Sequence, residues 1–468
     1  MTSSMTMTQI ILHGKPGQGY YTEMLIGTPP QKMNVLIDTG SSNFAIAATP
    51  HADISTFFHR VRSATFVDLD KKVKLPYTKG SWKGVLGSDV VSFVSLPNVT
   101  VTTKLACITS SEKFFVKDAH WQGILGLAYS AIARPDHSVE TFFTSMTHQL
   151  PGTQDVFSVQ LCGTIDTYNK TDISTGGTMT LGGFDESSYS GPIFYTPIRK
   201  EGYYEVIITD IRVNNQSLKL DCKEYNFDKT IVDSGTTNLR FPKLVFKHVV
   251  ERVKQHAKAN KLDALDDLWA GEKMLCWPVG DMPWYAFPTL SLHLAISHNT
   301  SFQLLVSPRQ YLREVAKDMN QENVSCFKFA IAPSHSGTVL GAVVMEGYYV
   351  VFDRQNHRVG FAKTSCPQHN TSNSTSHITG PFLVDFNTSK CAYVQATPQH
   401  TLVTVVAYVM VAVCAVCIFT VITLLLRRRL QSHFQRQRAN SGSTSLIDQL
   451  DGEGNVALGE QELEEHES

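Results

Sequence analysis

The chain contains one short pattern twice, an aspartate, a hydroxyl residue, a glycine and two more hydroxyl residues, at positions 38–42 and 233–237. Both copies follow a short aliphatic run, so each is predicted to lie where a buried strand ends and presents a carboxylate. The glycine lets another backbone or a substrate approach closely. The hydroxyl groups can hydrogen-bond the carboxylate or the opposite loop.

Each copy is followed further along by two apolar residues and a glycine. These triplets lie at positions 124–126 and 339–341, and their glycines are 88 and 108 residues beyond the two aspartates (126 − 38 and 341 − 233). A lone Asp-Thr-Gly occurs by chance in many turns. Two copies with the same downstream triplet indicate a duplicated unit. The length of 468 residues is enough for two lobes of ordinary size plus extra segments.

The paired motifs resemble those of the pepsin-type aspartic proteases, and their context resembles the membrane-anchored β-secretase (memapsin) branch of that family. The resemblance spans about residues 15–425 and rests on residues 19–21, 27–31, 38–44, 77–82, 123–129, 221–225, 231–240 and 345–347. It implies a mainly β, bilobal pepsin-like fold, here with a C-terminal single transmembrane helix.

The resemblance and the composition together give an expected domain organisation. We expect a leader at 1–18, an N-terminal protease lobe at 19–195, a C-terminal protease lobe at 196–392, a stalk at 393–400, a transmembrane helix at 401–426 and a cytoplasmic tail at 427–468. The leader has neither the basic start nor the long apolar run of a signal peptide, and it leaves no room for a pro-segment. We therefore expect an upstream exon or a truncated gene model.

The predicted membrane span is 26 residues without a charge, from Thr401 to Leu426. That length can cross a bilayer with some tilt. Arg427, Arg428 and Arg429 follow at once, so the positive-inside rule puts the C-terminal side in the cytoplasm. The alternative is a buried core helix, which an uncharged run of this length ending in three arginines disfavours. The polar tail from Leu430 is expected to be disordered.

Eight Asn-x-Ser/Thr sequons all precede the span, which fits a lumenal ectodomain. The candidate glycosylation sites are Asn98, Asn169, Asn215, Asn299, Asn323, Asn370, Asn373 and Asn387.

Seven cysteines also precede the span, and an oxidising compartment favours disulfides between them. Sequence arithmetic does not choose among the pairings. The resemblance implies Cys162–Cys366, Cys222–Cys391 and Cys276–Cys326, which leaves Cys107 in an apolar run as a buried, inert thiol. Cys414 and Cys417 lie within the span, where membrane packing is favoured over palmitoylation.

Asp38 and Asp233 are the candidate catalytic residues. Two carboxylates brought close together cannot easily both ionise, so one keeps its proton and the pair titrates as a unit. Aspartic proteases are a known example of this behaviour. Gly40 and Gly235 belong to the same loops. Ser41 and Thr236 are expected to hydrogen-bond the outer carboxylate oxygens, the alternative being simple loop capping.

A hairpin is predicted over residues 71–93, and the resemblance implies that it is a flap over the substrate. The candidate flap and substrate-binding residues are Tyr77, Thr78, Lys79, Gly80, Trp82, Trp121, Asn238 and Arg240. Tyr77 is expected to accept a hydrogen bond from the Trp82 indole, the alternative being a tyrosine of the core. Arg240 is implied to line the pocket for the substrate residue one before the scissile residue, or else to pair with a carboxylate of its own lobe.

Three further local expectations concern secondary structure. A short helix is expected over 138–150 with Ser138 as its N-cap, and a longer one over 242–260. Residues 192–197 are expected to connect the two lobes.

These features predict an aspartic-type endopeptidase with an acidic pH optimum that cleaves lumenal or juxtamembrane segments of membrane proteins. The partners are polypeptides, particularly type I membrane proteins, and the membrane itself. No cofactor, metal or nucleic acid is expected, because the net charge is −1 and the 17 histidines do not cluster at metal-ligand spacing.

The expected location is the Golgi, endosomes and cell surface, as a type I membrane protein. Leu446 and Ile447 resemble a dileucine sorting signal for adaptors, although Gly442 stands where the acidic residue is expected. The alternatives are a broad digestive or lysosomal protease, which the anchor disfavours, and a catalytically inactive receptor ectodomain, which the intact motifs disfavour.

Overall fold

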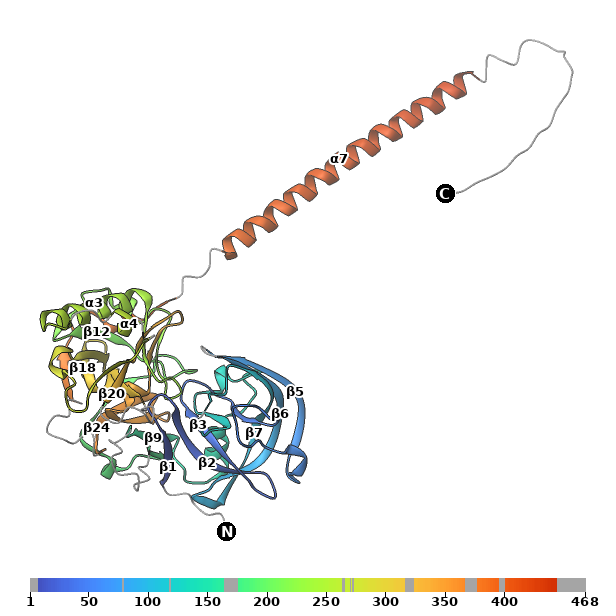
Figure 1. Ribbon diagram of the computed structural model, residues 1–468. Coiled ribbons are helices and arrows are strands. Elements are labelled where there is room, and N and C mark those ends of the chain that lie inside the picture. The colour runs from blue at the N-terminus through green and yellow to red at the C-terminus, as the bar shows by residue number, and fades with distance from the viewer. Residues whose placement is uncertain are drawn as a thin grey trace, which may run out of the picture. The chain divides into compact units, whose positions relative to one another are not determined.

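The computed structural model describes residues 7–77, 80–117, 119–163, 176–262, 266–269, 271, 273–315, 324–366, 377–394 and 400–443. The chain divides into two compact units, residues 1–394 and 395–468. The first unit is built mainly of β-strands, which confirms the predicted fold class. Figure 1 shows its early strands, in blue and cyan, gathered in one lobe, and α3, β12, β18 and β20 in the other.

One long sheet joins the strands of the first lobe to strands from late in the chain. Its order is β11-β24-β23-β9-β10-β1-β2-β3-β8-β4-β7-β6-β5. The strands are β1 (Thr8–Lys15), β2 (Gly19–Ile26), β3 (Gln31–Asp38), β4 (Phe44–Ala47), β5 (Val67–Pro76), β6 (Ser81–Phe93), β7 (Leu96–Glu112), β8 (Gly123–Gly126), β9 (Val156–Leu161), β10 (Gly177–Leu181), β11 (Tyr189–Pro197), β23 (Tyr348–Asp353) and β24 (Arg358–Thr364).

The two expected lobes share this sheet, because late strands insert beside early ones. β23 pairs antiparallel with β9, and β24 pairs with β11. The expected boundary between residues 195 and 196 therefore falls inside β11, and the segment 192–197 is a paired strand as well as a connection. Phe157 of β9 stacks on Phe352 of β23 with ring centroids 4.8 Å apart, so the junction is a packed core.

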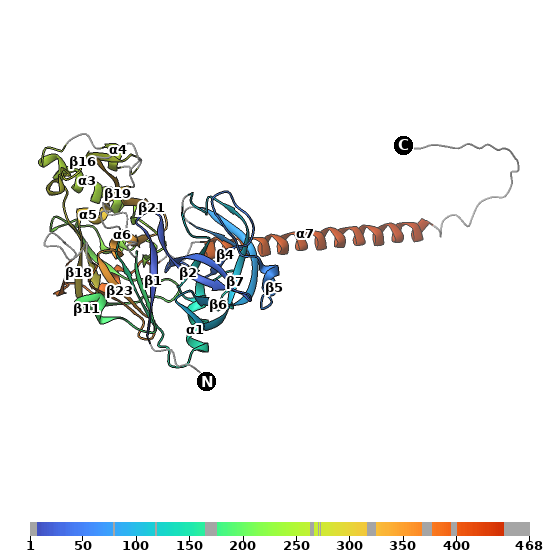
Figure 2. The ribbon, with the colours of Figure 1, turned by 60° about the horizontal axis from the view of Figure 1, so that its bottom comes forward.

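Three smaller sheets make up the second lobe, in the orders β13-β12-β17-β18-β25, β14-β22-β15-β21 and β16-β20-β19. Figure 2 shows β16, β18, β19 and β21 on the side of the first unit away from β5, β6 and β7. The strands are β12 (Ile208–Val213), β13 (Gln216–Ser217), β14 (Thr230–Val232), β15 (Leu239–Pro242), β16 (Leu275–Pro278), β17 (Leu290–Ala295), β18 (Thr300–Val306), β19 (Leu312–Val315), β20 (Val324–Phe329), β21 (Ile331–Ser334), β22 (Thr338–Leu340) and β25 (Ile378–Leu383).

The helices of the first unit are short, with one exception. They are α1 (Phe142–Gln149), α2 (Cys222–Tyr225), α3 (Lys243–Ala259), α4 (Asp266–Trp269), α5 (Pro308–Tyr311) and α6 (Ala342–Met345), with 3₁₀ turns η1 (Arg60–Arg62), η2 (Ser130–Ile132), η3 (Glu186–Ser188), η4 (Trp284–Ala286) and η6 (Thr388–Cys391).

Two helix predictions can be compared directly with these bounds. The helix expected over 242–260 is α3, which buries Val245, Val249 and Val253 on one face. The helix expected to begin after Ser138 begins after Thr141 instead, so that prediction is wrong at its start. The Thr141 side chain accepts from the Thr144 N–H, and this satisfies a donor that an uncapped helix would leave without a partner.

The structure forms the three disulfides that the resemblance implies, Cys162–Cys366, Cys222–Cys391 and Cys276–Cys326. Cys107 is a free, buried thiol, and burial raises its pKa to about 12. It is therefore an inert thiol at physiological pH.

The second unit contains one long helix, α7 (His400–Ser443). Its stretch Val403–Arg438 is long and apolar enough to cross a membrane, with mean hydropathy 3.0 in its most apolar window. The helix continues past the arginine triplet, so the expectation of disorder from Leu430 is wrong as far as Ser443. The reason is local, since residues 427–441 contain no Pro or Gly and include many arginine and glutamine residues, which favour helix. The Leu446–Ile447 signal and residues 395–399 of the stalk lie outside the described residues.

Candidate active site

The two aspartate motifs occupy equivalent positions in two related arrangements of strands. β3 ends at Asp38 and runs parallel to β8, with Asp38 opposite Gly126. β14 ends one residue before Asp233 and runs parallel to β22, with Val232 opposite Leu340. The apolar-apolar-glycine triplets are thus the strands that hold the aspartate strands, which explains why each motif has its own downstream triplet.

The glycines of these triplets are required by close backbone contact. A Cβ on Gly126 would lie 2.5 Å from the carbonyl carbon of Ser42 in the first loop. A Cβ on Gly341 would lie 2.5 Å from the carbonyl oxygen of Thr236 in the second loop. Both distances are well inside van der Waals contact, so only glycine lets the aspartate loop pass over the neighbouring strand.

Each carboxylate accepts the same two kinds of hydrogen bond from its own loop. The Gly40 N–H donates to Asp38 Oδ1 over 2.9 Å, and the Ser41 hydroxyl donates to Asp38 Oδ2. The Gly235 N–H donates to Asp233 Oδ1 over 2.9 Å, and Thr236 Oγ1 donates to Asp233 Oδ2 over 2.7 Å. The hydrogen bonds expected from the two hydroxyls are therefore present, and they fix the plane of each carboxylate.

A second set of hydrogen bonds joins the two loops to each other. The Thr39 N–H donates to Ser234 Oγ over 3.1 Å, and the Ser234 N–H donates to Thr39 Oγ1 over 3.0 Å. Each hydroxyl also donates across to the opposite strand, Thr39 to the Val232 carbonyl and Ser234 to the Ile37 carbonyl. All four bonds are buried, so the lobes are locked together directly beneath the carboxylates.

These bonds bring the two carboxyl groups face to face. A Cβ on Gly40 would overlap the Asp233 carboxylate, and a Cβ on Gly235 would overlap that of Asp38. Both aspartates are buried. Burial, followed by the charge of Asp233, raises the pKa of Asp38 well above its usual value. The arrangement therefore favours one shared proton at acidic pH.

The predicted hairpin is formed by β5 and β6, with Pro76 opposite Ser81. Tyr77 lies just beyond β5 and is half-buried, with its ring 5.4 Å from that of Phe114. Its hydroxyl accepts the expected hydrogen bond from Trp82 Nε1 over 3.2 Å. Burial, followed by the charge of nearby Asp38, raises the pKa of the Tyr77 phenol.

The hairpin tip is only partly described. Thr78 and Lys79 lie outside the described residues. Gly80 follows them with a φ of +83°, and its backbone packs against residues 112 and 113. A side chain at this position would be strained, so the glycine is needed for the turn.

The three remaining predicted substrate-binding residues have different environments. Trp121 is buried among Phe114 and Phe115, and its Nε1 donates to the Gln18 carbonyl, while its substrate-binding role stays a prediction. Asn238 and Arg240 are both half-buried on either side of the buried Leu239, as strand alternation predicts.

Arg240 does not form the carboxylate pair that was the alternative. Its Nη2 donates to the Pro333 carbonyl over 2.9 Å, and its Nε is buried without a hydrogen-bond partner among the described residues. No described carboxylate lies within ion-pair distance, although the Asp233 charge acts to raise the pKa of Arg240 against the lowering effect of burial. The guanidinium therefore keeps donor capacity near the second aspartate.

The sequence reasoning missed a buried polar cluster that joins the lobes. The Tyr20 hydroxyl of β2 donates to Glu346 Oε1 over 2.8 Å, although the two residues are 326 positions apart. Arg313 acts electrostatically on both and donates to the Pro16 carbonyl over 3.2 Å. Burial raises the pKa of Glu346 to about 7. The sequence signal that could have revealed this cluster was an acidic residue, Glu346, directly after the apolar run Ala342–Met345.

Four of the candidate glycosylation sites, Asn98, Asn215, Asn299 and Asn387, are exposed in the structure. The other four, Asn169, Asn323, Asn370 and Asn373, lie outside the described residues.

Comparison with known proteins gives a consistent set of similarities. The family model described as eukaryotic aspartyl protease matches residues 19–364. A β-secretase of Strongylocentrotus purpuratus is 48% identical over 448 residues, which cover 91% of this chain and 82% of that protein. Pepsin A of Canis lupus familiaris is 27% identical and Pepsin A of Suncus murinus 28% identical, each over 73% of this chain and 80% of the pepsin.

Proposed function

The chain belongs to the eukaryotic aspartyl protease family, on its pepsin-type β-secretase branch, and from that premise we propose that it is a membrane-anchored endopeptidase that cleaves the lumenal or juxtamembrane segments of other membrane proteins. Aspartic endopeptidase activity and polypeptide substrates follow from the family. The observation that carries the mechanism is the pair of glycines, Gly40 and Gly235, each pressed against the other lobe's carboxylate.

In the proposed reaction, a water held between Asp38 and Asp233 is the nucleophile. The ionised aspartate takes a proton from the water, whose oxygen attacks the peptide carbonyl carbon, while the protonated aspartate donates to the carbonyl oxygen. The resulting gem-diol collapses as a proton passes to the leaving nitrogen and the C–N bond breaks. Neither a metal nor a covalent intermediate is required for this sequence of steps.

The raised pKa of Asp38 sets the direction of the pH dependence. The mechanism needs one protonated and one ionised carboxyl group, and the pair loses its shared proton as the pH rises through the pKa of Asp38. Activity is therefore expected to be greatest at acidic pH and to fall toward neutrality. That dependence fits an acidic endosomal or Golgi lumen.

Tyr77 and Trp82 support a flap that closes over the substrate. The hydrogen bond between them holds the phenol at the end of β5, at the base of a turn made by Gly80. Closure of such a hairpin would exclude water and place the scissile bond against the carboxyl pair.

The apolar helix supports the membrane-anchored part of the proposal. The arginines at 427–429 would face the cytoplasm, and all eight sequons would then be lumenal. Anchoring the enzyme and a substrate in one membrane raises their effective concentration at the surface, which favours juxtamembrane cleavage sites.

The test is cleavage of quenched fluorescent peptides by the full chain and by Asp38→Asn and Asp233→Asn. Each substitution removes the proton-sharing pair, so kcat/KM is expected to fall by about 10³-fold or more. The wild type is expected to be most active at about pH 4.5 and nearly inactive at about pH 8. Exposed Asp281→Asn is the matched control and should retain full activity.

Two results would overturn the proposal. One is substantial activity in either catalytic variant with an unchanged melting temperature. The other is a wild-type optimum near neutral or alkaline pH, which a proton-sharing pair does not allow.

A further inference from the structure

A second candidate binding site lies in the C-terminal lobe, on the sheet β13-β12-β17-β18-β25. One face of this sheet contributes Leu292, Leu294, Phe302 and Leu304 to the core. The opposite face is polar, and its central row consists of Asp210, His293 and Gln303, which lie directly opposite one another on neighbouring strands. The polar face of an antiparallel sheet is usually exposed to water. Here part of it is buried.

Residues 382–391, which we call the covering segment, lie beside this face, and several of them line one pocket together with His293. Its Val384 N–H donates to the Asn299 carbonyl, and its Thr388 N–H donates to the His298 carbonyl, both over 2.9 Å. The Cys222–Cys391 disulfide fastens its end to α2. The covering segment is therefore held over the polar face by covalent and hydrogen bonds.

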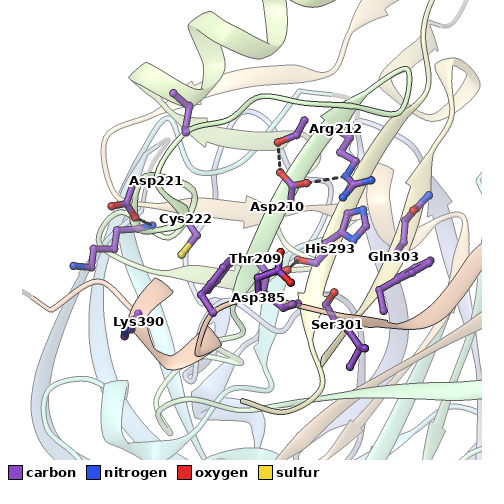
Figure 3. A pocket seen from close by; sticks show the side chains of 17 residues that line it. Thr209, Asp210, Arg212, Asp221, Cys222, His293, Ser301, Gln303, Asp385 and Lys390 are labelled. Carbon is purple, nitrogen blue, oxygen red and sulfur yellow. Dashed lines mark hydrogen bonds and ion pairs between the residues drawn. The ribbon is translucent and has the colours of Figure 1, made fainter. Parts of the chain in front are cut away.

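The segment does not fill the space beneath it, and a cavity of about 740 Å³ remains. That volume lies in the range of small-molecule pockets. Figure 3 shows the His293 ring in this pocket, with the Asp210–Arg212 pair on one side and Ser301 on the other. The catalytic aspartates are not among the residues that line it.

His293 is the unexplained group in the pocket. Its side chain lines the cavity although the residue is only 4% exposed, and its Nε2 has no hydrogen-bond partner among the described residues. A buried polar atom without a partner is costly, so a ligand that hydrogen-bonds it gains affinity. Burial, and then the charge of Arg212, lowers the pKa of His293 to about 4, so the imidazole is neutral through most of the acidic range.

The other lining groups indicate an uncharged, aromatic ligand. Asp210 is already satisfied, since it accepts from Arg212 Nε and from the Ser217 hydroxyl, each over 2.7 Å. The charged lining residues balance at three of each sign, Asp210, Asp221 and Asp385 against Arg212, Lys223 and Lys390.

Phenylalanine and leucine side chains of the covering segment supply an apolar part of the lining. Phe382, whose ring lies 5.7 Å from that of His293, lines the pocket together with Phe386 and Leu383, and Leu383 is 83% exposed. Aromatic rings favour an aromatic guest in offset or edge contact.

We propose that this pocket is a second binding site, separate from the carboxyl pair, for an uncharged aromatic hydroxyl group. The ring contacts Phe382 and Phe386, and the hydroxyl hydrogen-bonds Nε2 of His293. A phenol can either donate or accept, so it suits either tautomer of the neutral imidazole. The group is either the tyrosine side chain of a polypeptide or a free phenol, and these two sources share the same recognition chemistry.

The binding test uses the full chain in lipid nanodiscs, with empty nanodiscs to subtract partition into lipid. Saturation-transfer NMR measures binding of N-acetyl-tyrosinamide and N-acetyl-phenylalaninamide, which differ only in the hydroxyl. Losing one neutral hydrogen bond to a buried partner is expected to weaken binding about fivefold. His293→Leu is expected to abolish this difference between the two amides, whereas the exposed His335→Leu should leave it unchanged.

A second variant keeps the proposal testable if His293→Leu does not fold. Phe386 is 40% exposed, so Phe386→Ala should fold normally and weaken binding of both amides without removing the preference for tyrosine. Both variants are expected to keep wild-type cleavage of a short peptide, since neither touches the carboxyl pair. This readout separates the binding site from the proposed catalytic function, whose failure would leave the NMR result unaffected.

The source of the group is distinguished by comparing phenol with Ac-Ser-Tyr-Ser-NH2. Tighter binding of the tripeptide supports a polypeptide, and equal or tighter binding of phenol supports a small molecule. Equal binding of the tyrosine and phenylalanine amides would overturn the proposal. So would an absence of saturable binding, or displacement of the amide by a transition-state analogue bound at the aspartates.

Discussion

The two aspartate loops, residues 38–43 and 233–238, have the same hydrogen-bonding pattern but different surroundings. In each, a glycine N–H and a hydroxyl hold the carboxylate. The first hydroxyl, Ser41, is buried on the side where Tyr77 and the hairpin lie. The second, Thr236, is half-exposed, with Arg240 a few residues beyond it. The two matching loops thus bring the carboxyl groups together, and their different surroundings make Asp38 and Asp233 chemically distinct.

The residues that follow the two triplet glycines, Gly126 and Gly341, also differ in their surroundings. After the first triplet glycine, Tyr129 packs its ring under the Arg354 guanidinium, 4.6 Å from the ring centroid. After the second, α6 leads to Glu346, which accepts from Tyr20 of the other lobe. The Tyr129–Arg354 contact has a fixed charge, whereas Glu346 in the Tyr20–Glu346 contact can titrate. A difference in pH response between the two halves follows.

The strongest test of the symmetry is to add one methyl group to Gly40 and to Gly235 in separate variants. Gly40→Ala would press on the Asp233 carboxylate and Gly235→Ala on that of Asp38, so both should separate the pair. A displacement of about 1 Å costs roughly 100-fold in rate, so kcat/KM should fall by at least that factor in each variant. Peptide cleavage at acidic pH measures the loss.

The matched control is Gly183→Ala. The atoms nearest to its Cβ would be those of the Met7 side chain, at 3.3 Å or more, and this side chain can move aside. Wild-type activity in Gly40→Ala or in Gly235→Ala would show that the two carboxyl groups need not lie this close together.

The next test concerns Glu346, the titratable residue that follows the second loop and accepts from Tyr20. The pKa of Glu346 is raised to about 7 by burial, so the folded chain holds a proton that the unfolded chain releases above its ordinary pKa of 4.5. Stability from this group is present below pH 4.5 and is lost as the pH rises toward 7. The raised pKa of Asp38 acts with the same sign.

Glu346→Gln should therefore flatten the fall in stability between about pH 5 and pH 7.5, by on the order of 3 kcal/mol. The measurement is the melting temperature of the full chain at both pH values. Glu314→Gln, an exposed glutamate beside Arg313 on β19, is the control and should follow the wild type. If Glu346→Gln loses stability as steeply as the wild type, Glu346 is ionised in the folded protein throughout this range.

A smaller effect is expected from Arg240, which follows the second loop. Its Nε–H group has no hydrogen-bond partner among the described residues. Arg240→Leu should shift preference from Asp or Asn toward apolar residues at the substrate position one before the scissile residue. Charge-assisted hydrogen bonds contribute about 1.5–3 kcal/mol, so selectivity should change by about tenfold or more. Competitive cleavage of a peptide library varied at that position gives the ratio. A uniform slowing of all peptides would mean that Arg240 only supports the Pro333 backbone.

The smallest expected effect compares the two hydroxyls directly. Ser41→Ala should lower kcat/KM by about tenfold, because the hydroxyl is buried between Asp38 and Tyr77. Thr236→Ser keeps the hydroxyl and should have little effect, while Thr236→Ala should cost about threefold because water can replace the half-exposed hydroxyl. Equal losses in the two alanine variants would indicate that their surroundings do not matter.

The elements that repeat, or that depend on local chemistry, could be predicted from the amino-acid sequence. The two aspartate motifs with their apolar-glycine triplets predicted the carboxyl pair, and an uncharged run of 26 residues predicted the long apolar helix. The hairpin, the Trp82–Tyr77 hydrogen bond and the hydroxyls on the carboxylates were also predictable. The disulfides came from the family resemblance, since spacing alone left the pairing open. Errors occurred at helix ends, where Thr141 displaced Ser138 as the cap and α7 continued into the polar tail.

Tertiary structure alone decided the contacts between residues that are far apart in the chain. Thr39 and Ser234 are 195 positions apart, Tyr20 and Glu346 are 326 apart, and the covering segment reaches His293 from about 90 residues beyond it. Such contacts leave no periodic pattern in the sequence, because each partner alone is an ordinary residue of a strand or loop. Their energies depend on burial, and burial is known only once strands from both halves of the chain pair in one sheet.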